Sequence, residues 1–237
     1  FKYIPPKTFD HELPSQAIPE IAFLGRSNVG KSSLLNSLTH KHLARISKTP
    51  GRTQQVNYFG LFQTSTNDHR SEQQQQQQQQ LPLGFLIDLP GYGYAKAPEA
   101  NVEEWQANTQ NFIEARIEHG NLQRIYILVD SRRGLSGFDS SILGWLDEAG
   151  CDYTLVLTKS DAVGRAKLIK VANDICMRHH MQTVMGDDVA GLGFQSPFVH
   201  LTSSKKNEGI VDLMWAIEND FTAGMSDRNN ANGWSKQ

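Results

Sequence analysis

The sequence has 237 residues, of which 38% are hydrophobic and 20% are charged, and its formal net charge is −2. This composition is that of a soluble globular protein with enough chain for one well-cored domain. No stretch approaches the ~20 apolar residues of a membrane-spanning helix, and the near-neutral charge argues against indiscriminate attraction to nucleic acid.

The sequence predicts one domain with an extension at each end. Prolines in residues 1–15 indicate an extended arm, and the domain itself is expected to cover residues 16–222. The polar, asparagine-rich residues 223–237 predict a disordered tail. Eight consecutive glutamines occupy positions 73–80. Because such a tract cannot bury enough apolar surface to order itself, residues 64–82 are expected to form a mobile hairpin tip.

The N-terminal residues and the cysteines indicate where the protein works. Residues 1–14 hold no apolar core of signal-peptide length, so nothing in them suggests export. Cys151 and Cys176 form neither a close pair nor a metal-ligand cluster, and we expect them to be reduced thiols. The sequence therefore predicts a cytoplasmic protein, which we expect to be monomeric.

Strand and helix patterns alternate along the domain. Short apolar runs bounded by turn residues predict buried strands, and apolar residues three or four apart predict helices. The predicted strands cover residues 21–24, 57–63, 83–88, 125–129, 153–157 and 198–201. The predicted helices cover 31–38, a segment from Val102 to Ile117, a segment capped by Asp139, 165–179 and 208–219. This alternation predicts an α/β fold whose sheet is mostly parallel, with one antiparallel edge strand and helices on both faces.

A phosphate-binding loop lies between the first predicted strand and the first predicted helix. The Walker A pattern is matched at every required position by Gly25, Arg26, Ser27, Asn28, Val29, Gly30, Lys31 and Ser32. Its glycines let backbone N–H groups turn toward phosphate oxygens, and the N-terminus of the helix adds its positive end. We expect Lys31 to reach the β- and γ-phosphates and the hydroxyl of Ser32 to ligate Mg²⁺. The alternative is a chance glycine-rich turn, which the flanking strand and helix make less favourable.

Between this loop and the next strand, a switch segment would need a threonine that ligates the metal and contacts the γ-phosphate. Thr49 and Thr53 are both candidates. We favour Thr53 because Pro50 and Gly51 make a sharp turn just before it. The predicted nucleotide contacts in this segment are Gly51, Arg52, Thr53, Gln54 and Gln55.

A carboxylate follows the third predicted strand, where a Walker B aspartate is expected. The string there is Asp88, Leu89, Pro90 and Gly91. Asp88 is expected to hold the metal directly or through water, and Gly91 to offer its N–H to the γ-phosphate. Because that second contact exists only with the triphosphate, the loop after Gly91 is expected to act as a switch.

A second string is expected to choose the base. Thr158, Lys159, Ser160 and Asp161 follow the fifth predicted strand. The Asp161 carboxylate can accept two hydrogen bonds from guanine, whereas adenine offers no such pair of donors. The stem of Lys159 can lie along the ring plane. Backbone N–H groups for the guanine carbonyl are expected from Thr202, Ser203 and Ser204.

Taken together, these strings resemble the EngB family, also called YihA or YsxC, of the translation-factor-related class of small GTPases. The most specific strings are Lys48-Thr49-Pro50-Gly51-Arg52-Thr53-Gln54 and Asp88-Leu89-Pro90-Gly91-Tyr92-Gly93-Tyr94-Ala95. The resemblance covers about residues 9–221. It implies a P-loop GTPase (G domain) fold, GTP or GDP with Mg²⁺ as ligands, and a ribosomal particle or rRNA as partner. It further implies a role in assembly of the large ribosomal subunit and in cell division with septation. The glutamine tract and a glycine-rich segment at 185–196 depart from the family pattern.

Three other functions are compatible with parts of the sequence. Asp161 argues against a P-loop kinase or ATPase. A binding module that depends on a partner for catalysis is harder to separate, because Tyr92 stands where Ras-like proteins have the glutamine that orients water. Slow GTP hydrolysis is expected of this protein whether it is a GTPase in its own right or such a binding module. A GTPase that acts on another RNA or tRNA process is the third alternative.

Potassium is a further candidate cofactor. Hydrolysis needs positive charge near the oxygen that bridges the β- and γ-phosphates, and the side-chain carbonyl of Asn28 is placed to ligate a cation there. The resemblance implies the same, because related GTPases with asparagine at this position use potassium. The alternative is that Asn28 only shapes the loop, since asparagine tolerates turn conformations.

Overall fold

The computed structural model describes residues 1–4, 18–41, 43–44, 56–62, 82–92, 99–184 and 195–233. Its strands are β1 (Lys2–Ile4), β2 (Glu20–Gly25), β3 (Asn57–Leu61), β4 (Gly84–Asp88), β5 (Leu122–Asp130), β6 (Tyr153–Thr158) and β7 (Gln195–Leu201). Its helices are α1 (Lys31–Thr39), α3 (Glu99–Glu118), α4 (Gly137–Glu148), α5 (Arg165–Val184) and α6 (Ile210–Gly233), with a short 3-10 helix, η2 (Ser160–Ala162).

The described strands form one seven-stranded sheet in the order β1-β3-β4-β2-β5-β6-β7. Strands β4, β2, β5, β6 and β7 run parallel to one another, whereas β3 runs antiparallel to both of its neighbours, β4 and β1. The predicted α/β fold with a mostly parallel sheet is therefore confirmed. The antiparallel strand is not the edge strand, however, because three residues of the predicted N-terminal arm pair outside it as β1.

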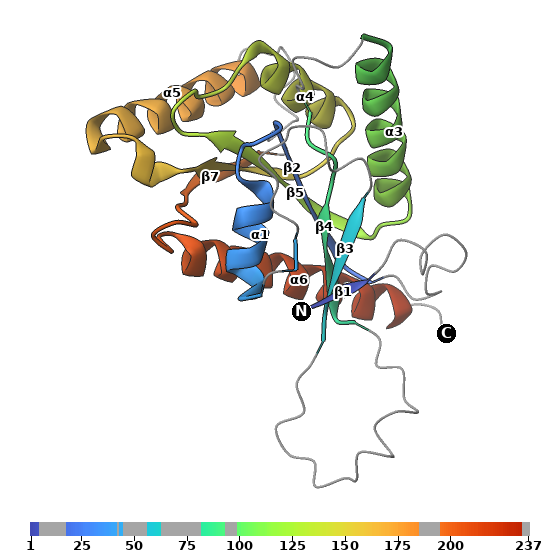
Figure 1. The fold of residues 1–237 in the computed structure, drawn as a ribbon. Helices are drawn as coiled ribbons and strands as arrows, with labels where there is room; N and C mark the ends of the chain where they lie inside the picture. The colour runs from blue at the N-terminus through green and yellow to red at the C-terminus, as the bar shows by residue number, and fades with distance from the viewer. Residues whose placement is uncertain are drawn as a thin grey trace, which may run out of the picture.

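Helices cover both faces of the sheet, with α1 and α6 on one face and α3, α4 and α5 on the other (Figure 1). The alternation of side chains along β2 shows how one strand serves both layers. Ile21 and Phe23 pack toward α1 and α6, whereas Ala22 and Leu24 pack toward the other three helices. All four are buried, as expected for a central parallel strand between two helical layers.

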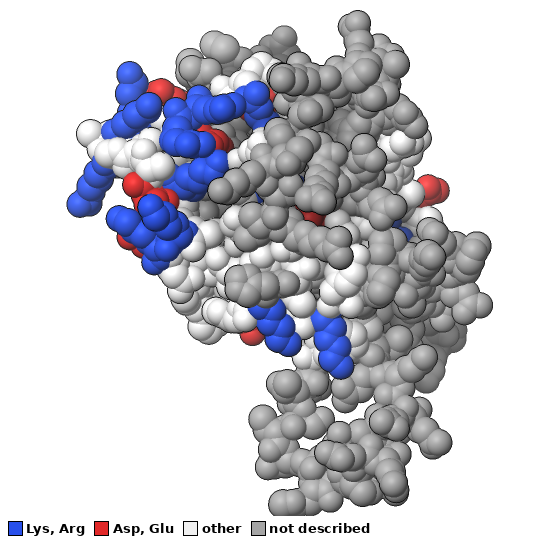
Figure 2. Space-filling view, in the orientation of Figure 1, with Lys and Arg blue, Asp and Glu red and all other residues white. Residues whose placement is uncertain are grey.

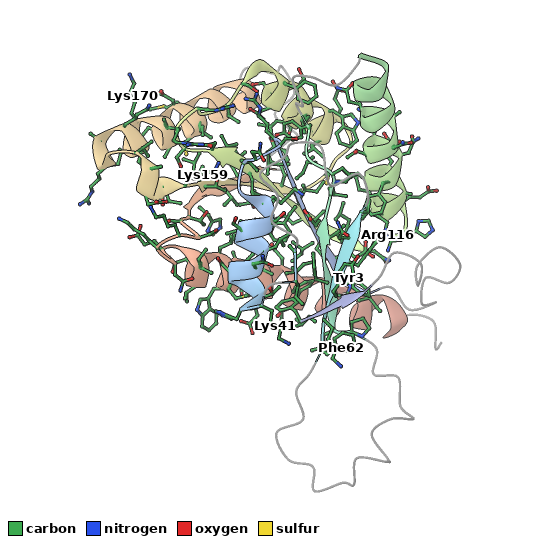
Figure 3. The ribbon with its side chains drawn as sticks, in the orientation of Figure 1. Tyr3, Lys41, Phe62, Arg116, Lys159 and Lys170 are labelled. Carbon is green, nitrogen blue, oxygen red and sulfur yellow. The ribbon has the colours of Figure 1, made fainter. Side chains whose placement is uncertain are left out.

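A buried ion pair fixes the C-terminal end of α3 to the start of β2. The Nε of Arg116 donates to Oε2 of Glu20 at 2.7 Å, and its Nη2 binds Oε1 of the same carboxylate. The two side chains are 5% and 1% exposed. Figure 3 shows Arg116 on α3 beside the strands of the sheet. Because both partners are charged and buried, each depends on the other for its solvation.

The start of α4 differs from its prediction. Ser136, rather than Asp139, is the N-cap residue, and its hydroxyl accepts from the N–H of Asp139. The carboxylate of Asp139 in turn accepts from the N–H of Ser136, which completes a capping box. Asp139 thus helps to cap the helix from its third position.

The last helix is longer than predicted. We expected a helix over 208–219 followed by a disordered tail from 223, but α6 continues to Gly233. Phe221 explains why the helix passes its predicted end, since its ring is buried against β4. A Cβ placed on Gly84 would lie only 2.5 Å from that ring, so a strand glycine makes room for it.

The predicted hairpin between the second and third predicted strands is present at its base. β3 and β4 are antiparallel neighbours, and the N–H of Leu83 donates to the carbonyl of Leu61 at 2.7 Å. The tip predicted over 64–82 lies outside the described residues except for Pro82, as do 185–194 and 234–237. Within the described part of the chain, no helix combines the length and the apolar character needed to cross a membrane.

Candidate nucleotide site

The sequence strings meet where the parallel strands end. In the sheet register, Phe23 lies beside Asp88, Gly25 beside Leu128, and Asp130 beside Thr158. The loops after β2, β4, β5 and β6 therefore leave the sheet at the same edge. In open α/β sheets, ligands bind at this carboxyl edge.

The Walker A loop has the tight conformation that its glycines predict. Asn28 and Gly30 both have positive φ, of 64° and 113°, and α1 begins directly afterward. A Cβ on Gly25 would lie 2.9 Å from the carbonyl oxygen of Leu128, so no side chain fits between the loop and β5. The N–H of Val29 donates to the carbonyl of Arg26 at 3.0 Å, which closes the turn.

Lys31 and Asp88, which we predicted to serve phosphate and metal, form an ion pair with each other. Their side chains are 8% and 4% exposed. They lie 57 positions apart in the sequence, yet the sheet register brings the first residue of α1 to the end of β4. The structure thus places a cation and a carboxylate together beside the Walker A loop.

The segment from Leu89 to Tyr92 is bound to the strand that precedes the Walker A loop. The N–H of Tyr92 donates to the carbonyl of Gly25 at 3.2 Å, and the carbonyl of Tyr92 accepts from the N–H of Ser27 at 2.8 Å. A Cβ on Gly91 would approach the Gly25 carbonyl oxygen to 3.2 Å. The two predicted phosphate-binding segments are therefore in direct backbone contact.

The side chain of Tyr92 is buried in the protein interior. It is only 2% exposed and packs on Phe138, with the ring centroids 5.3 Å apart. Its hydroxyl donates to Oδ1 of Asp139 at 2.6 Å. Sequence reasoning missed Asp139 as a partner of this loop, and the signal available was only its role in capping a helix.

Residues 158–161, which we predicted to read the base and call the base-reading loop, are fastened to the Walker A loop by Thr158 and Lys159. The hydroxyl of Thr158 donates to the carbonyl of Val29 at 2.7 Å. Lys159 has a positive φ of 56°, and its Nζ donates to the carbonyl of Asn28 at 2.6 Å. Figure 3 shows Lys159 at the end of the sheet close to the loop before α1.

Asp130 is the second residue that sequence reasoning missed. Its carboxylate accepts from Nζ of Lys159 at 2.9 Å and from the side chain of Arg132. Although burial alone would raise the pKa of Asp130, the hydrogen bonds from Arg132 and Lys159 hold it well below its ordinary value. Asp130 therefore stays ionised and orients the lysine. Its place at the end of β5 was the available signal.

Asp161 is oriented by the loop after β7. The hydroxyl of Ser203 donates to Oδ1 of Asp161 at 2.7 Å, and this bond holds the pKa of Asp161 below its ordinary value. The N–H of Ser160 donates to the carbonyl of Thr202 at 3.0 Å. The two loops predicted to bind the base are thus held together.

The N–H groups after β7 are used differently from our expectation. Those of Thr202 and Ser203 donate to the carbonyls of Leu157 and Glu208, at 2.7 Å and 3.0 Å. Both groups are therefore engaged within the protein. Ser204 is therefore the remaining candidate among the three predicted donors. The predicted contacts at residues 51–55, including Thr53, lie outside the described residues.

The known proteins that resemble this chain are GTPases or GTP-binding proteins. A model of the family described as 50S ribosome-binding GTPase matches residues 20–159. The chain is 38% identical over 213 residues to the probable GTP-binding protein EngB of Chelativorans sp. (strain BNC1), which covers 90% of this chain and 84% of that protein. It is 41% identical over 206 residues to the protein of the same name from Mesorhizobium japonicum, with 86% of each chain covered.

Solved structures agree on the fold. A crystal structure of a probable GTP-binding protein EngB has a TM-score of 0.57 at 21% identity, covering 86% of this chain and 99% of that chain. Aquifex aeolicus Era bound to GDP and AlF4⁻ also has a TM-score of 0.57, at 18% identity, covering 85% of this chain and 56% of that chain. From the sequence match over most of its length, the chain belongs to the EngB family of P-loop GTPases.

Proposed function

We propose that the protein is a slow GTPase that switches between GDP and GTP forms during assembly of the large ribosomal subunit, and that it is required for normal cell division and septation. One observation carries the nucleotide part of this proposal. Lys159 and Thr158 join the base-reading loop to the Walker A loop, so one rigid unit presents groups for guanine and for phosphates together. The ribosomal part is supported by the family description, 50S ribosome-binding GTPase.

The residues present fit a nucleotide with magnesium. The Walker A loop has the tight turn, with positive φ at Asn28 and Gly30, that such a phosphate-binding loop needs, and the buried charges of Lys31 and Asp88 lie beside it. We assign Lys31 to the phosphates, and Ser32, Asp88 and Thr53 to Mg²⁺. Magnesium, when bound, neutralises charge on the phosphate oxygens. Within the described residues, no group of three or more His, Cys, Asp or Glu forms a separate metal site.

Base recognition is assigned to the loops after β6 and β7. The Asp161 carboxylate accepts from guanine, the N–H of Ser204 donates to the guanine carbonyl, and the stem of Lys159 lies along the ring. Hydrolysis proceeds by attack of water on the γ-phosphorus with departure of the bridging oxygen. Turnover is slow because Tyr92, buried against Phe138, is not available to orient that water.

The surface next to the base-reading loops suits a polyanionic partner. Figure 2 shows Lys and Arg side chains gathered at the corner of the molecule where α5 lies. Arg165, Lys167 and Lys170 on α5 are exposed, as are Lys205 and Lys206 in the loop after β7. Such a surface favours the phosphate backbone of rRNA. We propose that the protein is a cytoplasmic monomer that binds a ribosomal particle.

Cosedimentation with purified ribosomal subunits tests the ribosomal role. We expect binding to large subunits in the presence of a non-hydrolysable GTP analogue and weaker binding with GDP. Small subunits serve as the control particle. Binding to small subunits alone would indicate that the protein acts in another RNA process. No binding in either nucleotide state would overturn the ribosomal assignment.

A dependence on potassium is the second test. We propose that the side-chain carbonyl of Asn28, which is exposed in the Walker A loop, ligates K⁺ beside the β- and γ-phosphates. GTP turnover is then expected to be faster in potassium chloride than in sodium chloride at equal ionic strength. Asn28→Gly should erase the difference, because glycine keeps the positive φ but lacks the carbonyl. Equal rates in the two salts for the parent protein would refute potassium use.

A further inference from the structure

Tyr92 is attached to two parts of the molecule at once. Through its backbone it is bound to Gly25 and Ser27, at the start of the Walker A loop. Through its hydroxyl it is bound to Asp139, in the first turn of α4. The residue after Gly91 therefore bridges the phosphate-binding loops and a helix on one face of the sheet.

Asp139 is itself held firmly, so it is a rigid acceptor. Its Oδ2 accepts from the N–H of Ser136 at 2.7 Å and from the Ser136 hydroxyl at 2.6 Å, which leaves Oδ1 for Tyr92. Asp139 is 1% exposed. Burial, together with the carboxylate of Asp139, raises the pKa of Tyr92 well above its ordinary value, so its hydroxyl remains a donor around neutral pH.

Gly91 fits closely against the start of the Walker A loop. Gly91 precedes Tyr92 directly, and a Cβ on it would lie 3.2 Å from the Gly25 carbonyl oxygen and 3.3 Å from the Ser27 nitrogen. In so close a fit, a small displacement of Tyr92 would shift the N–H of Gly91. A hydrogen bond to a phosphate oxygen weakens steeply when its distance or angle departs from the optimum.

We propose that Tyr92 is a positioning residue, whose hydroxyl, held by Asp139, keeps the N–H of Gly91 placed for the γ-phosphate. Recognition of GTP, as opposed to GDP, then depends on the capped end of α4. This inference rests on the proposed contact between Gly91 and the γ-phosphate. It gives Tyr92 a role in distinguishing GTP from GDP, whereas groups other than Tyr92 orient the attacking water.

Tyr92→Phe tests the inference, because it removes only the hydroxyl and keeps the ring on Phe138. The affinity for a non-hydrolysable GTP analogue should fall about tenfold, as for loss of the hydrogen bond from Gly91 to the γ-phosphate, while GDP affinity stays within about twofold. Fluorescent analogues of the two nucleotides measure both values. A purely structural role would lower both affinities together or neither.

Tyr126→Phe is the matched control. The Tyr126 hydroxyl donates to Oδ2 of Asp220 at 2.7 Å, and Tyr126 is 1% exposed, so this variant also loses a hydrogen bond from a buried tyrosine to an aspartate. It lies between β5 and α6, on the other face of the sheet. The ratio of GTP-analogue to GDP affinity should therefore be that of the parent. Thermal unfolding of both variants shows how much stability each has lost.

Asp139→Ala completes a double-mutant cycle and supplies a second variant should Tyr92→Phe not fold. If the hydroxyl acts through Asp139, Asp139→Ala should lower the affinity ratio, and adding Tyr92→Phe should change it no further. Independent, additive effects would overturn the inference, as would an unchanged ratio in Tyr92→Phe. A parent protein that fails to bind the GTP analogue would instead refute the proposed function itself.

Discussion

Lys31→Ala is expected to weaken binding of both GTP and GDP by about a hundredfold or more. A hydrogen bond from a charged group contributes about 1.5–3 kcal/mol. The variant also leaves the Asp88 carboxylate buried without its cation, next to the proposed phosphate site. Together these effects reach the ~2.8 kcal/mol that corresponds to a hundredfold change. Isothermal titration calorimetry with GDP measures the loss.

Two further variants separate binding from folding in this experiment. Lys167→Ala removes an exposed lysine of α5 and should bind GDP like the parent. Lys31→Met with Asp88→Leu removes both buried charges, and should regain thermal stability relative to Lys31→Ala without regaining affinity. GDP affinity of folded Lys31→Ala within threefold of the parent would show that Lys31 serves only the ion pair.

Asp161→Asn is expected to move base preference from guanine toward xanthine. The variant loses an acceptor for the guanine donors and offers an amide donor, which suits the extra carbonyl of xanthine. Loss of a charged contact corresponds to about 1.5–3 kcal/mol, or more than tenfold in GTP affinity. Competition between GTP and XTP for a fluorescent nucleotide measures the change. Unaltered GTP affinity would show that Asp161 does not recognise the base.

Ser203→Ala and Asp174→Asn refine this test. Ser203→Ala removes the hydroxyl that orients Asp161, so guanine affinity should fall while guanine is still preferred to xanthine. The same change returns the pKa of Asp161 toward its ordinary value, so guanine binding should begin to fail at a higher pH as the solution is acidified. Asp174→Asn, an exposed change on α5, should alter neither property.

Local patterns in the sequence predicted most of the fold and the order of its motifs. The Walker A loop runs from the end of a strand to the start of a helix, so the roles of Gly25, Gly30 and Lys31 depend on neighbours within a few residues. Asp88 and Asp161 each follow an apolar run, and the common edge of a parallel sheet then brings them together. These are the features whose physical cause lies within a short window of sequence.

The rest depends on contacts between distant residues. The bond from Tyr92 to Asp139 spans 47 positions and required knowledge of where α4 begins. The N–H groups of Thr202 and Ser203 are engaged within the protein through bonds that follow from how β7 and its loop are placed. The pairing of β1 with β3 involves only three residues, too few to produce a periodic pattern.

The same holds for the length of α6. Its polar and asparagine-rich end gives little helical preference by itself. Phe221 fills a space that Gly84 leaves on a strand more than a hundred positions earlier in the sequence. Packing of Phe221 against the sheet therefore carries α6 beyond its predicted end at residue 219.

The ion pair between Glu20 and Arg116 has an evolutionary consequence. Loss of either partner alone leaves a buried charge and destabilises the fold by about 3–5 kcal/mol, a large part of the 5–15 kcal/mol that holds a typical domain together. Replacement of both by apolar residues of similar volume carries no such penalty. Related sequences should therefore either keep both charged residues at positions 20 and 116 or replace both of them together.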